Sequence, residues 1–412
     1  MVSPKDREIL RALGQQYMEA ASEPRNAETV KLWRALNGGR MERPMVNIDQ
    51  LPHHELDVDD SRTCHVEDPF WRSIERTMRR ELYMYRNFPV DMVIEPFIKL
   101  PMAVHDSGYG LAVEDDRLMM DAANDVVSHR YKTLFDETFD LSRIQDRQFT
   151  HDVAETDRRR TEGEDIFAGI APIRMQGVWF NLGMWDVITT WLGVESCYVM
   201  IMDEPEFIHR LMRRMTDSML AGIRQVDALQ ISDDTANVCH CSYLYDDEFL
   251  PEPGMGKGPR TKNSWAAGLA QLFSSVSPAV TEEFELPYIS ELAKEFGSIY
   301  YGCCDKLSDR MDLMKKIPNV RKVSCSPWSD KEQFAEGIDP SMIISCKPNP
   351  AFLATDTMDE EVIRRDLQEY CDFAKKYNKR LEIILKDIST VRYRPERLAR
   401  WNQIAMDVVK GW

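Results

Sequence analysis

Residues 298–326 read SIYYGCCDKLSDRMDLMKKIPNVRKVSCS, and this stretch decides the fold. It begins with a short apolar run at 298–301, continues through an amphipathic segment around 308–317, and returns to an apolar run at 320–324. Short apolar strands that alternate with amphipathic helices indicate parallel strands joined by crossover helices. The stretch therefore predicts a β-α-β unit of a parallel sheet.

The same alternation continues to the end of the chain. Two more strands are predicted at 342–345 and 381–385, and helices are predicted around 331–336, 359–377 and 395–409. Four such units in a row, in a chain of 412 residues, favour a closed barrel over an open doubly wound sheet. No glycine-rich dinucleotide-binding motif follows any of these strands. We therefore expect an α/β fold of the (β/α)8 TIM-barrel type.

The rest of the chain adds to this barrel. Apolar positions recur at three and four residues within 1–40, which predicts an N-terminal helical extension. We assign 41–412 to a single barrel domain. Two stretches are expected to be insertions: 145–170, which is very polar, and 239–262, which is rich in proline and glycine.

Composition narrows the class of protein. Hydrophobic residues make up 43% of the chain and charged residues 29%, as in a globular protein with a sizeable core. The formal net charge of −17 argues against a nucleic-acid-binding surface or a basic membrane-binding patch. The sequence shows no transmembrane span and no signal peptide, so we expect a cytoplasmic protein. Its nine cysteines are then free thiols or metal ligands.

Cysteines follow three consecutive predicted strands. Cys303 and Cys304 come after the first, Cys325 after the second and Cys346 after the third. The active site of a TIM barrel lies at the carboxyl ends of its strands, and thiolates gathered there suit zinc. His240, between two further cysteines, is a weaker candidate ligand. The alternative is that these cysteines only fill space in the core.

Other polar residues also follow predicted strands. Asp233 and Asp234 are candidate catalytic residues, as a general base or a substrate anchor, and Lys386 is a candidate electrostatic clamp. Trp328, Lys347 and Asn349 follow two further strands and are candidate substrate-binding residues. The alternatives are a helix or loop cap for the aspartates and a structural ion pair with Asp387 for Lys386.

From about residue 40 onward the chain resembles the uroporphyrinogen decarboxylase superfamily, which includes the cobamide-dependent methyltransferases. Several segments in the same order carry the resemblance: Arg43-Pro44, PEFIHRLM at 205–212, Asp233-Asp234, SPAVTEEFELPY at 277–288, Gly302-Cys303-Cys304, Asn349-Pro350, and 397–401. The resemblance implies a single (β/α)8 barrel with its pocket at the carboxyl ends of the strands.

Two departures from the family decide which chemistry the resemblance implies. True decarboxylases carry an Arg-Gln-Ala-Gly-Arg motif that grips the porphyrin, whereas MVNIDQLPHHEL follows Arg43-Pro44 here, so uroporphyrinogen is an unlikely substrate. The methyltransferases bind zinc through His-x-Cys at the strand end matched here by 301–304, and through a later cysteine. No histidine follows His240 in this chain, so the resemblance implies a zinc site altered in its ligands.

The favoured hypothesis is a corrinoid-dependent methyltransferase. It would move a methyl group between a small substrate, either a thiol or a methyl ether, and cobalamin carried by a separate corrinoid protein, with zinc activating the substrate. One alternative is a zinc-free decarboxylase or other lyase-like barrel enzyme whose Lys347, Lys386 and Arg394 hold a carboxylated small molecule. The other is a non-enzymatic tetrapyrrole-binding protein.

Overall fold

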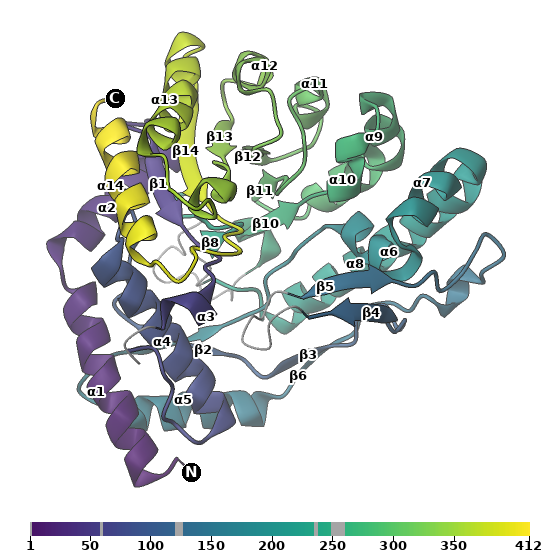
Figure 1. Ribbon diagram of the computed structural model, residues 1–412. Coiled ribbons are helices and arrows are strands. Elements are labelled where there is room, and N and C mark those ends of the chain that lie inside the picture. Colours follow the sequence, from purple (N-terminus) through teal and green to yellow (C-terminus); the bar gives the residue numbers. More distant parts are fainter. Residues whose placement is uncertain (1, 58–60, 120–126, 235–237, 249–259) are drawn as a thin grey trace.

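The computed structural model describes residues 2–57, 61–119, 127–234, 238–248 and 260–412 (Figure 1). Its helices are α1 Pro4–Ala21, α2 Pro24–Asn37, α3 His53–Leu56, α4 Pro69–Asn87, α5 Val153–Ile166, α6 Met184–Leu192, α7 Val194–Asp203, α8 Pro205–Leu229, α9 Pro278–Phe284, α10 Leu286–Ala293, α11 Met311–Met314, α12 Lys331–Gly337, α13 Glu360–Lys376 and α14 Glu396–Lys410. No helix within these ranges is long and apolar enough to cross a membrane.

The strands fall into one main sheet and four small pairs. They are β1 Met45–Ile48, β2 Ile98–Pro101, β3 Val104–Asp106, β4 Asp115–Leu118, β5 Ser128–Tyr131, β6 Phe149–His151, β7 Ile173–Gln176, β8 Val238–Cys239, β9 Ser242–Tyr243, β10 Trp265–Gly268, β11 Ser298–Tyr301, β12 Val320–Cys325, β13 Ile343–Cys346 and β14 Arg380–Leu385. The main sheet has six strands in the order β1-β14-β13-β12-β11-β10, and all of its pairs are parallel. The parallel α/β sheet predicted from 298–412 is therefore confirmed.

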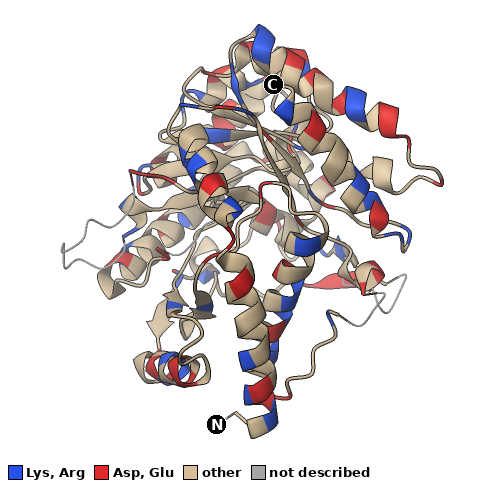
Figure 2. Cartoon of the chain, turned by 90° about the vertical axis from the view of Figure 1, so that its left-hand side faces the viewer, with Lys and Arg blue, Asp and Glu red and all other residues tan. Residues whose placement is uncertain are grey.

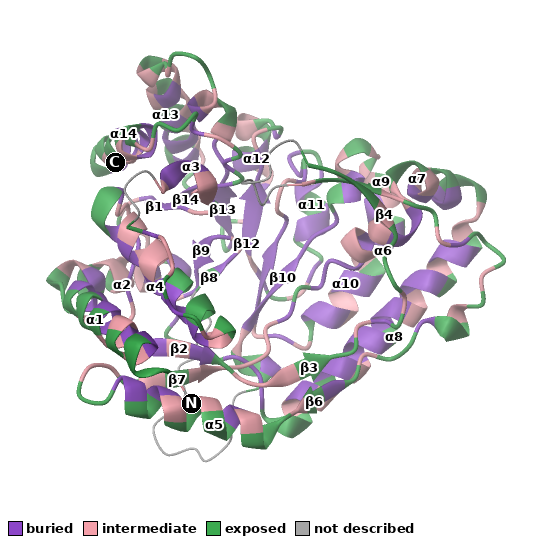
Figure 3. Ribbon diagram, turned by 60° about the horizontal axis from the view of Figure 1, so that its bottom comes forward, coloured by how far each residue is buried: buried purple, intermediate pink, exposed green. Residues whose placement is uncertain are grey.

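The outer face of the main sheet is covered by the crossover helices (Figure 1). Alternate residues of the central strands, among them Val323, Ile344 and Ile383, lie in the principal hydrophobic core with Leu367 of α13 and Trp401 of α14. In Figure 3 the sheet strands are buried, while α13 and α14 carry exposed residues on the side away from the sheet. The helix layer is needed because a parallel sheet is stable only when its faces are covered.

Closure into eight strands is not seen in the part of the chain that the structure describes. β2 and β7 form a separate parallel pair, and single bridges link Val178 to Ser232 and Asn181 to Ala267. The apolar run at 228–231, expected as the strand that precedes Asp233 and Asp234, is mostly helix, because α8 continues to Leu229 and Gln230 ends it in the left-handed conformation. What remains extended after Gln230 is too short for a ladder, so the architecture is TIM-barrel-like without a detected closed barrel.

The predicted additions to the barrel have definite structure. Helices α1 and α2 occupy most of 1–40, and Leu10 and Trp33 lie in a second hydrophobic core with Trp71 of α4. The stretch 145–170, expected to be an exposed insertion, contains β6 and α5. Of 239–262, residues 249–259 lie outside the described residues. Acidic and basic residues are interleaved along the ribbon in Figure 2.

Gly177 is required where the chain leaves β7 and passes the 231–233 segment. A Cβ atom there would lie 2.4 Å from the backbone oxygen of Ile231 and 2.8 Å from that of Ser232. Since backbone atoms cannot move aside as a flexible side chain can, Gly177→Ala is expected to destabilise the protein by about 1–3 kcal/mol. The measurement is urea unfolding. Gly411→Ala, whose Cβ would meet its nearest atom at 3.5 Å, is the control, and an equal loss in both variants would contradict the prediction.

Candidate active site

The inner face of the main sheet is polar, although it is buried. Lys322 of β12 and Glu382 of β14 are both fully buried, and their side chains form an ion pair with Nζ 2.7 Å from Oε2. On the neighbouring strands, the Tyr300 hydroxyl donates a hydrogen bond of 2.6 Å to Ser345 Oγ. Lys347 Nζ donates to the same Ser345 oxygen at 2.9 Å. These contacts place the polar side chains of four strands on one face, opposite the hydrophobic core.

The β8–β9 hairpin lies against this polar face. Ser242 Oγ accepts a hydrogen bond of 2.6 Å from Lys322 Nζ, and Asn47 Nδ2 of β1 donates one of 2.7 Å to the Cys241 carbonyl. His240 and Cys241 form the two-residue turn, with φ of 45° and 69°. Two left-handed residues in succession fit the type I′ turn that the twist of a hairpin favours. The turn brings the His240 ring onto Tyr300, with the ring centroids 5.2 Å apart.

Four side chains form a closed cluster where β11 and β14 end. Lys386 Nζ lies 3.1 Å from Cys303 Sγ, and Cys303 Sγ lies 3.9 Å from Cys304 Sγ. Cys304 Sγ donates to Asp387 Oδ2 at 3.2 Å, and Asp387 Oδ2 lies 2.8 Å from Lys386 Nζ. We call Cys303, Cys304, Lys386 and Asp387 the Cys303 cluster. Lys386 is buried and Asp387 is exposed, so the cluster lies at the border between the interior and solvent.

The cluster stabilises a thiolate at Cys303. The contact with Cys304, with 3.9 Å between the two sulfur atoms, lowers the pKa of Cys303 most, and His240 and the positive charge of Lys386 lower it further. The same contact raises the pKa of Cys304, so this thiol stays protonated. Burial alone would lower the pKa of Lys386, but the Cys303 thiolate and Asp387 raise it. A half-buried thiolate beside an ammonium group is the usual environment of a reactive cysteine.

Two carboxylates near Cys303 had not been singled out from the sequence. Asp305 is buried and accepts hydrogen bonds from the Cys303 N–H at 2.7 Å and the Ala270 N–H at 3.2 Å, which fixes the loop that carries Cys303. Asp186, in the first turn of α6, has its pKa raised to about 6 by burial and by the charges of Asp305 and Cys303. Asp305 directly follows a predicted strand, whereas no strand pattern in the sequence points to Asp186.

Two of the four predicted metal-ligating cysteines lie elsewhere. Cys325 and Cys346 are paired in register on β12 and β13, and both belong to the hydrophobic core on the outer face. Burial raises the pKa of Cys346, and its neighbours there include Cys371 of α13. Because side chains alternate along a strand, these two thiols are directed away from the face that carries Lys347 and Tyr300. The structure therefore does not bring Cys325 and Cys346 together with the Cys303 cluster.

The predicted zinc site is not seen as a preformed ligand group among the described residues, and zinc binding stays a prediction. Among them, no group of three or more histidine, cysteine, aspartate or glutamate side chains is arranged to hold a metal ion. Cys303, Cys304 and His240 are near one another, but the two outer-face cysteines cannot complete a tetrahedral set from where they lie. None of the nine cysteines is in a disulfide.

Asp233 and Asp234 interact with a different set of charges. Burial lowers the pKa of Lys99 of β2, and the Asp233 charge partly offsets this. Burial together with the Asp233 charge raises the pKa of Asp234. Arg174 of β7 partly offsets that rise. No described contact joins the two aspartates to the Cys303 cluster, so their predicted catalytic role stays a prediction.

The predicted substrate-binding residues are in three different settings. Trp328 is 66% exposed and Asn349 caps the short 3-10 helix at Pro350–Leu353 by accepting from the Ala351 N–H. Lys347, in contrast, is 2% exposed and no carboxylate among the described residues forms an ion pair with it. Lys347 is thus the one of the three that lies on the polar inner face beside Tyr300.

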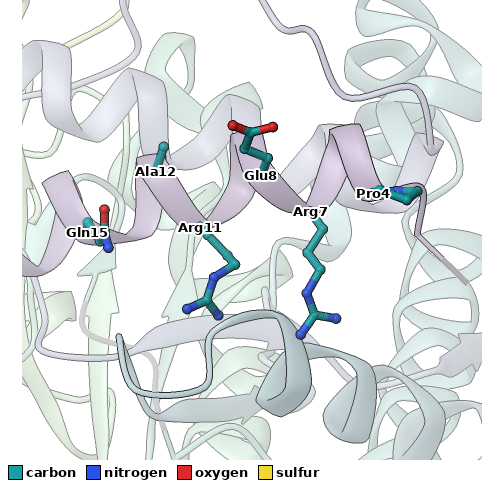
Figure 4. Close-up of a pocket in the computed structure, with 6 residues that line it drawn as sticks. All are labelled: Pro4, Arg7, Glu8, Arg11, Ala12 and Gln15. Carbon is teal, nitrogen blue, oxygen red and sulfur yellow. The ribbon is translucent and has the colours of Figure 1, made fainter.

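A separate hollow of about 370 Å³ lies on α1, lined by Pro4, Arg7, Glu8, Arg11, Ala12 and Gln15 (Figure 4). Figure 4 shows the Arg7 and Arg11 side chains extending from α1 toward a neighbouring segment of the same protein. Arg7 forms an ion pair with Asp165, and Arg11 donates to the Ile166 carbonyl, so both already bind the end of α5. The hollow therefore belongs to the packing of α1 and is not a candidate active site.

The thiolate at Cys303 predicts an unusual pH dependence of alkylation. Because its pKa is lowered, Cys303 is expected to react with iodoacetamide at a rate that hardly changes between about pH 6 and 8, where an ordinary thiol of pKa about 8.5 gains reactivity steeply. Cys64 is a partly exposed internal reference, and burial raises its pKa. Peptide mass spectrometry measures both rates in one sample. A Cys303 rate that rises with pH as that of Cys64 does would contradict the prediction.

Comparison with known proteins supports the fold. No family model matches the chain, and no curated protein matches its sequence. Among solved structures, a methyltransferase from Methanosarcina mazei is similar, with a TM-score of 0.50 and 12% sequence identity. The similarity covers 92% of this chain and 97% of the other. At this identity the similarity establishes the fold and no more, and it extends over nearly the whole of both chains.

Proposed function

We propose that this protein is a methyltransferase that moves a methyl group between a small-molecule substrate, a thiol or a methyl ether, and cobalamin carried by a separate corrinoid protein. The observation that carries the proposal is the Cys303 thiolate, held by Lys386 where β11 and β14 end. The fold shared with the methyltransferase from Methanosarcina mazei supports it. Cobalamin would supply a cobalt centre that accepts or releases the methyl group.

The residues around Cys303 suit methyl transfer. A thiolate in the site can act as a charge or as a nucleophile during methyl transfer, and Lys386, with Nζ 3.1 Å from the Cys303 sulfur, favours its ionised form. Asp186, with a pKa of about 6, can exchange a proton with the oxygen or sulfur atom that gains or loses the methyl group. Asp305 keeps the Cys303 loop in place. The proposal does not depend on zinc, whose binding stays a prediction.

The test is a methyl-transfer assay that follows the absorption spectrum of cobalamin. The protein is incubated with methylcobalamin, free or bound to a corrinoid protein, and with a panel of thiols and phenols. Loss of the methylcobalamin spectrum that depends on the protein and on one class of acceptor is expected. Cys64→Ser should retain the activity and Cys303→Ser should lose it. An unchanged spectrum with every acceptor would count against the proposal.

The buried Lys347 supports a second candidate function, that of a decarboxylase or other lyase-like enzyme. A buried lysine with no carboxylate ion-pair partner among the described residues offers a charge for a substrate carboxylate, as a decarboxylase or other lyase-like enzyme acting on a carboxylated small molecule would need. In that case Lys347→Met would abolish turnover, while Cys303→Ser would keep it. Release of carbon dioxide from a carboxylic acid panel, measured in both variants, separates this function from methyl transfer.

A further inference from the structure

We propose that Cys303 carries the methyl group itself, as S-methylcysteine, between donor and acceptor. This inference rests on the proposed methyl-transfer function and adds a covalent step to it. The alternative within that function is direct transfer from donor to acceptor, with Cys303 acting only as a charge in the site. The arrangement around Cys303 Sγ favours the covalent step.

The sulfur of Cys303 lies beside the Lys386 ammonium group, which stabilises it as an anion. Lys386 Nζ is 3.1 Å away, Cys304 Sγ is 3.9 Å away, and the His240 ring is close enough to lower the Cys303 pKa. Asp305 binds the backbone N–H of Cys303 and leaves the sulfur free. Charge placed on this sulfur is thus stabilised in the way an oxyanion hole stabilises a developing oxyanion. The same donors serve a thiolate that attacks and a thiolate that leaves.

Two displacements complete the cycle, and each balances. In the first, an electron pair of the Cys303 thiolate forms a bond to the methyl carbon. The bond from that carbon to the donor atom breaks, and its electron pair stays with the donor, which is cobalt or a substrate oxygen or sulfur. In the second, an electron pair of the acceptor forms a bond to the methyl carbon, the carbon–sulfur bond breaks, and the pair returns to Cys303. A substrate oxygen or sulfur atom takes up or gives up its proton at Asp186.

The cluster tolerates both states of the sulfur. Methylation makes Cys303 neutral and takes away one anion beside Lys386. Lys386 keeps a second anionic partner, Asp387, at 2.8 Å, so its buried ammonium group does not become an isolated charge. Buried charges are costly unless they are paired, and this pairing removes most of that cost in the methylated state.

The electrostatics favour release of the methyl group. The contact with Cys304, and then His240 and the positive charge of Lys386, lower the pKa of Cys303. A thiolate whose conjugate acid has a low pKa leaves faster, although it attacks somewhat more slowly. Release from an ordinary methyl thioether is the difficult half of such a cycle. The Cys303 cluster therefore assists the step that most needs assistance.

The experiment detects the intermediate directly. The full-length protein is incubated with free methylcobalamin carrying a deuterated methyl group, then denatured, digested and analysed by mass spectrometry. The peptide that contains Cys303 is expected to gain one labelled methyl group. The label should be absent in Cys303→Ser and unchanged in Cys64→Ser. Label on Cys304 alone, or no label on either residue, would overturn the carrier role.

A second measurement tests that the intermediate is competent. Labelled protein is freed of methylcobalamin and mixed with reduced cobalamin or with a thiol acceptor, and loss of label from Cys303 is followed with time. Loss into the acceptor is expected, and it should be slower in Lys386→Met, which lacks the group that stabilises the leaving thiolate. A label that persists would show a dead-end alkylation and overturn the inference. Cobalamin-dependent turnover in Cys303→Ser at the wild-type rate would overturn the carrier role, because methyl transfer would then proceed without Cys303. Absence of turnover in the wild-type protein would instead overturn the proposed function.

Discussion

Lys386→Met is expected to lower the rate of methyl transfer by about 100-fold, the usual effect of removing one well-placed donor from a charge-stabilising site. Lys386 Nζ lies 3.1 Å from Cys303 Sγ and also pairs with Asp387. Without the ammonium group, the pKa of Cys303 rises and less thiolate is present at neutral pH. The pH at which activity reaches half of its maximum should therefore move upward, so the loss is smaller in alkaline buffer. Steady-state rates across pH measure both effects.

The control variants separate charge from packing. Lys386→Arg keeps the positive charge and should retain part of the activity, with a smaller shift of the pH profile. Lys331→Met removes a lysine that pairs with Asp366 and Glu369 on the outer helices, so it should leave the pH profile unchanged. If Lys386→Met kept the wild-type rate and profile, Lys386 would be a structural residue, and the thiolate would depend on Cys304 and His240.

The second half of the fold could be predicted because local pattern and architecture agree there. Each apolar run from 298 onward is short and is followed by an amphipathic helix, and the strands β11 to β14 lie where the pattern indicates, within one residue. Around 228–231 the apolar run is in fact the end of α8, since the helical pattern of 205–229 continues into it. When a short apolar run directly follows a long helix, its sequence does not show whether it forms a strand or the last turn of that helix.

The candidate site could be predicted only in part. Strand ends pointed to Cys303, Cys304 and Lys386, and the structure brings these three side chains together, while their roles stay predictions. Cys325 and Cys346 also follow from strand ends, but in a parallel sheet both faces are buried, so the sequence does not show which face a residue occupies. We therefore grouped Cys325 and Cys346 with Cys303 as candidate metal ligands, whereas both lie in the hydrophobic core on the outer face of the sheet.

Other parts of the site depend on contacts that are distant in sequence. His240 reaches Tyr300 because the hairpin turn at 240–241 adopts left-handed backbone conformations, which neither residue type predicts. Asp186 comes close to Cys303 only through the packing of α6 against the loop after β10, where it accepts hydrogen bonds from Gln271. Nothing in the residues around Asp186 marks it as different from any other acidic residue in a first helical turn.

The polar inner face leads to the largest expected effect on stability. Glu382→Gln is expected to destabilise the protein by about 3–5 kcal/mol, because it leaves the fully buried Lys322 ammonium group without its counter-charge. Burial already lowers the pKa of Lys322, with Glu382 partly offsetting this, so the variant lowers that pKa further. The unfolded chain then binds more protons than the folded one below the unfolded lysine pKa of about 10.4. Stability of Glu382→Gln should therefore rise with pH, and urea unfolding at several pH values measures it.

Removing both partners should cost less than the sum of the two single losses. In Lys322→Met/Glu382→Leu no charge is left buried, and two apolar side chains of similar size occupy the space, although Ser242 loses both of its partners there. The exposed pair Lys315–Asp312 is the matched control, and its removal should change stability by less than about 1 kcal/mol. Additive losses in the double variant would mean that Lys322 and Glu382 each hold the β8–β9 hairpin independently. If the double variant loses much less stability than the sum of the two single variants, the ion pair acts as one unit. That unit then holds the β8–β9 hairpin, whose His240 ring lies against Tyr300.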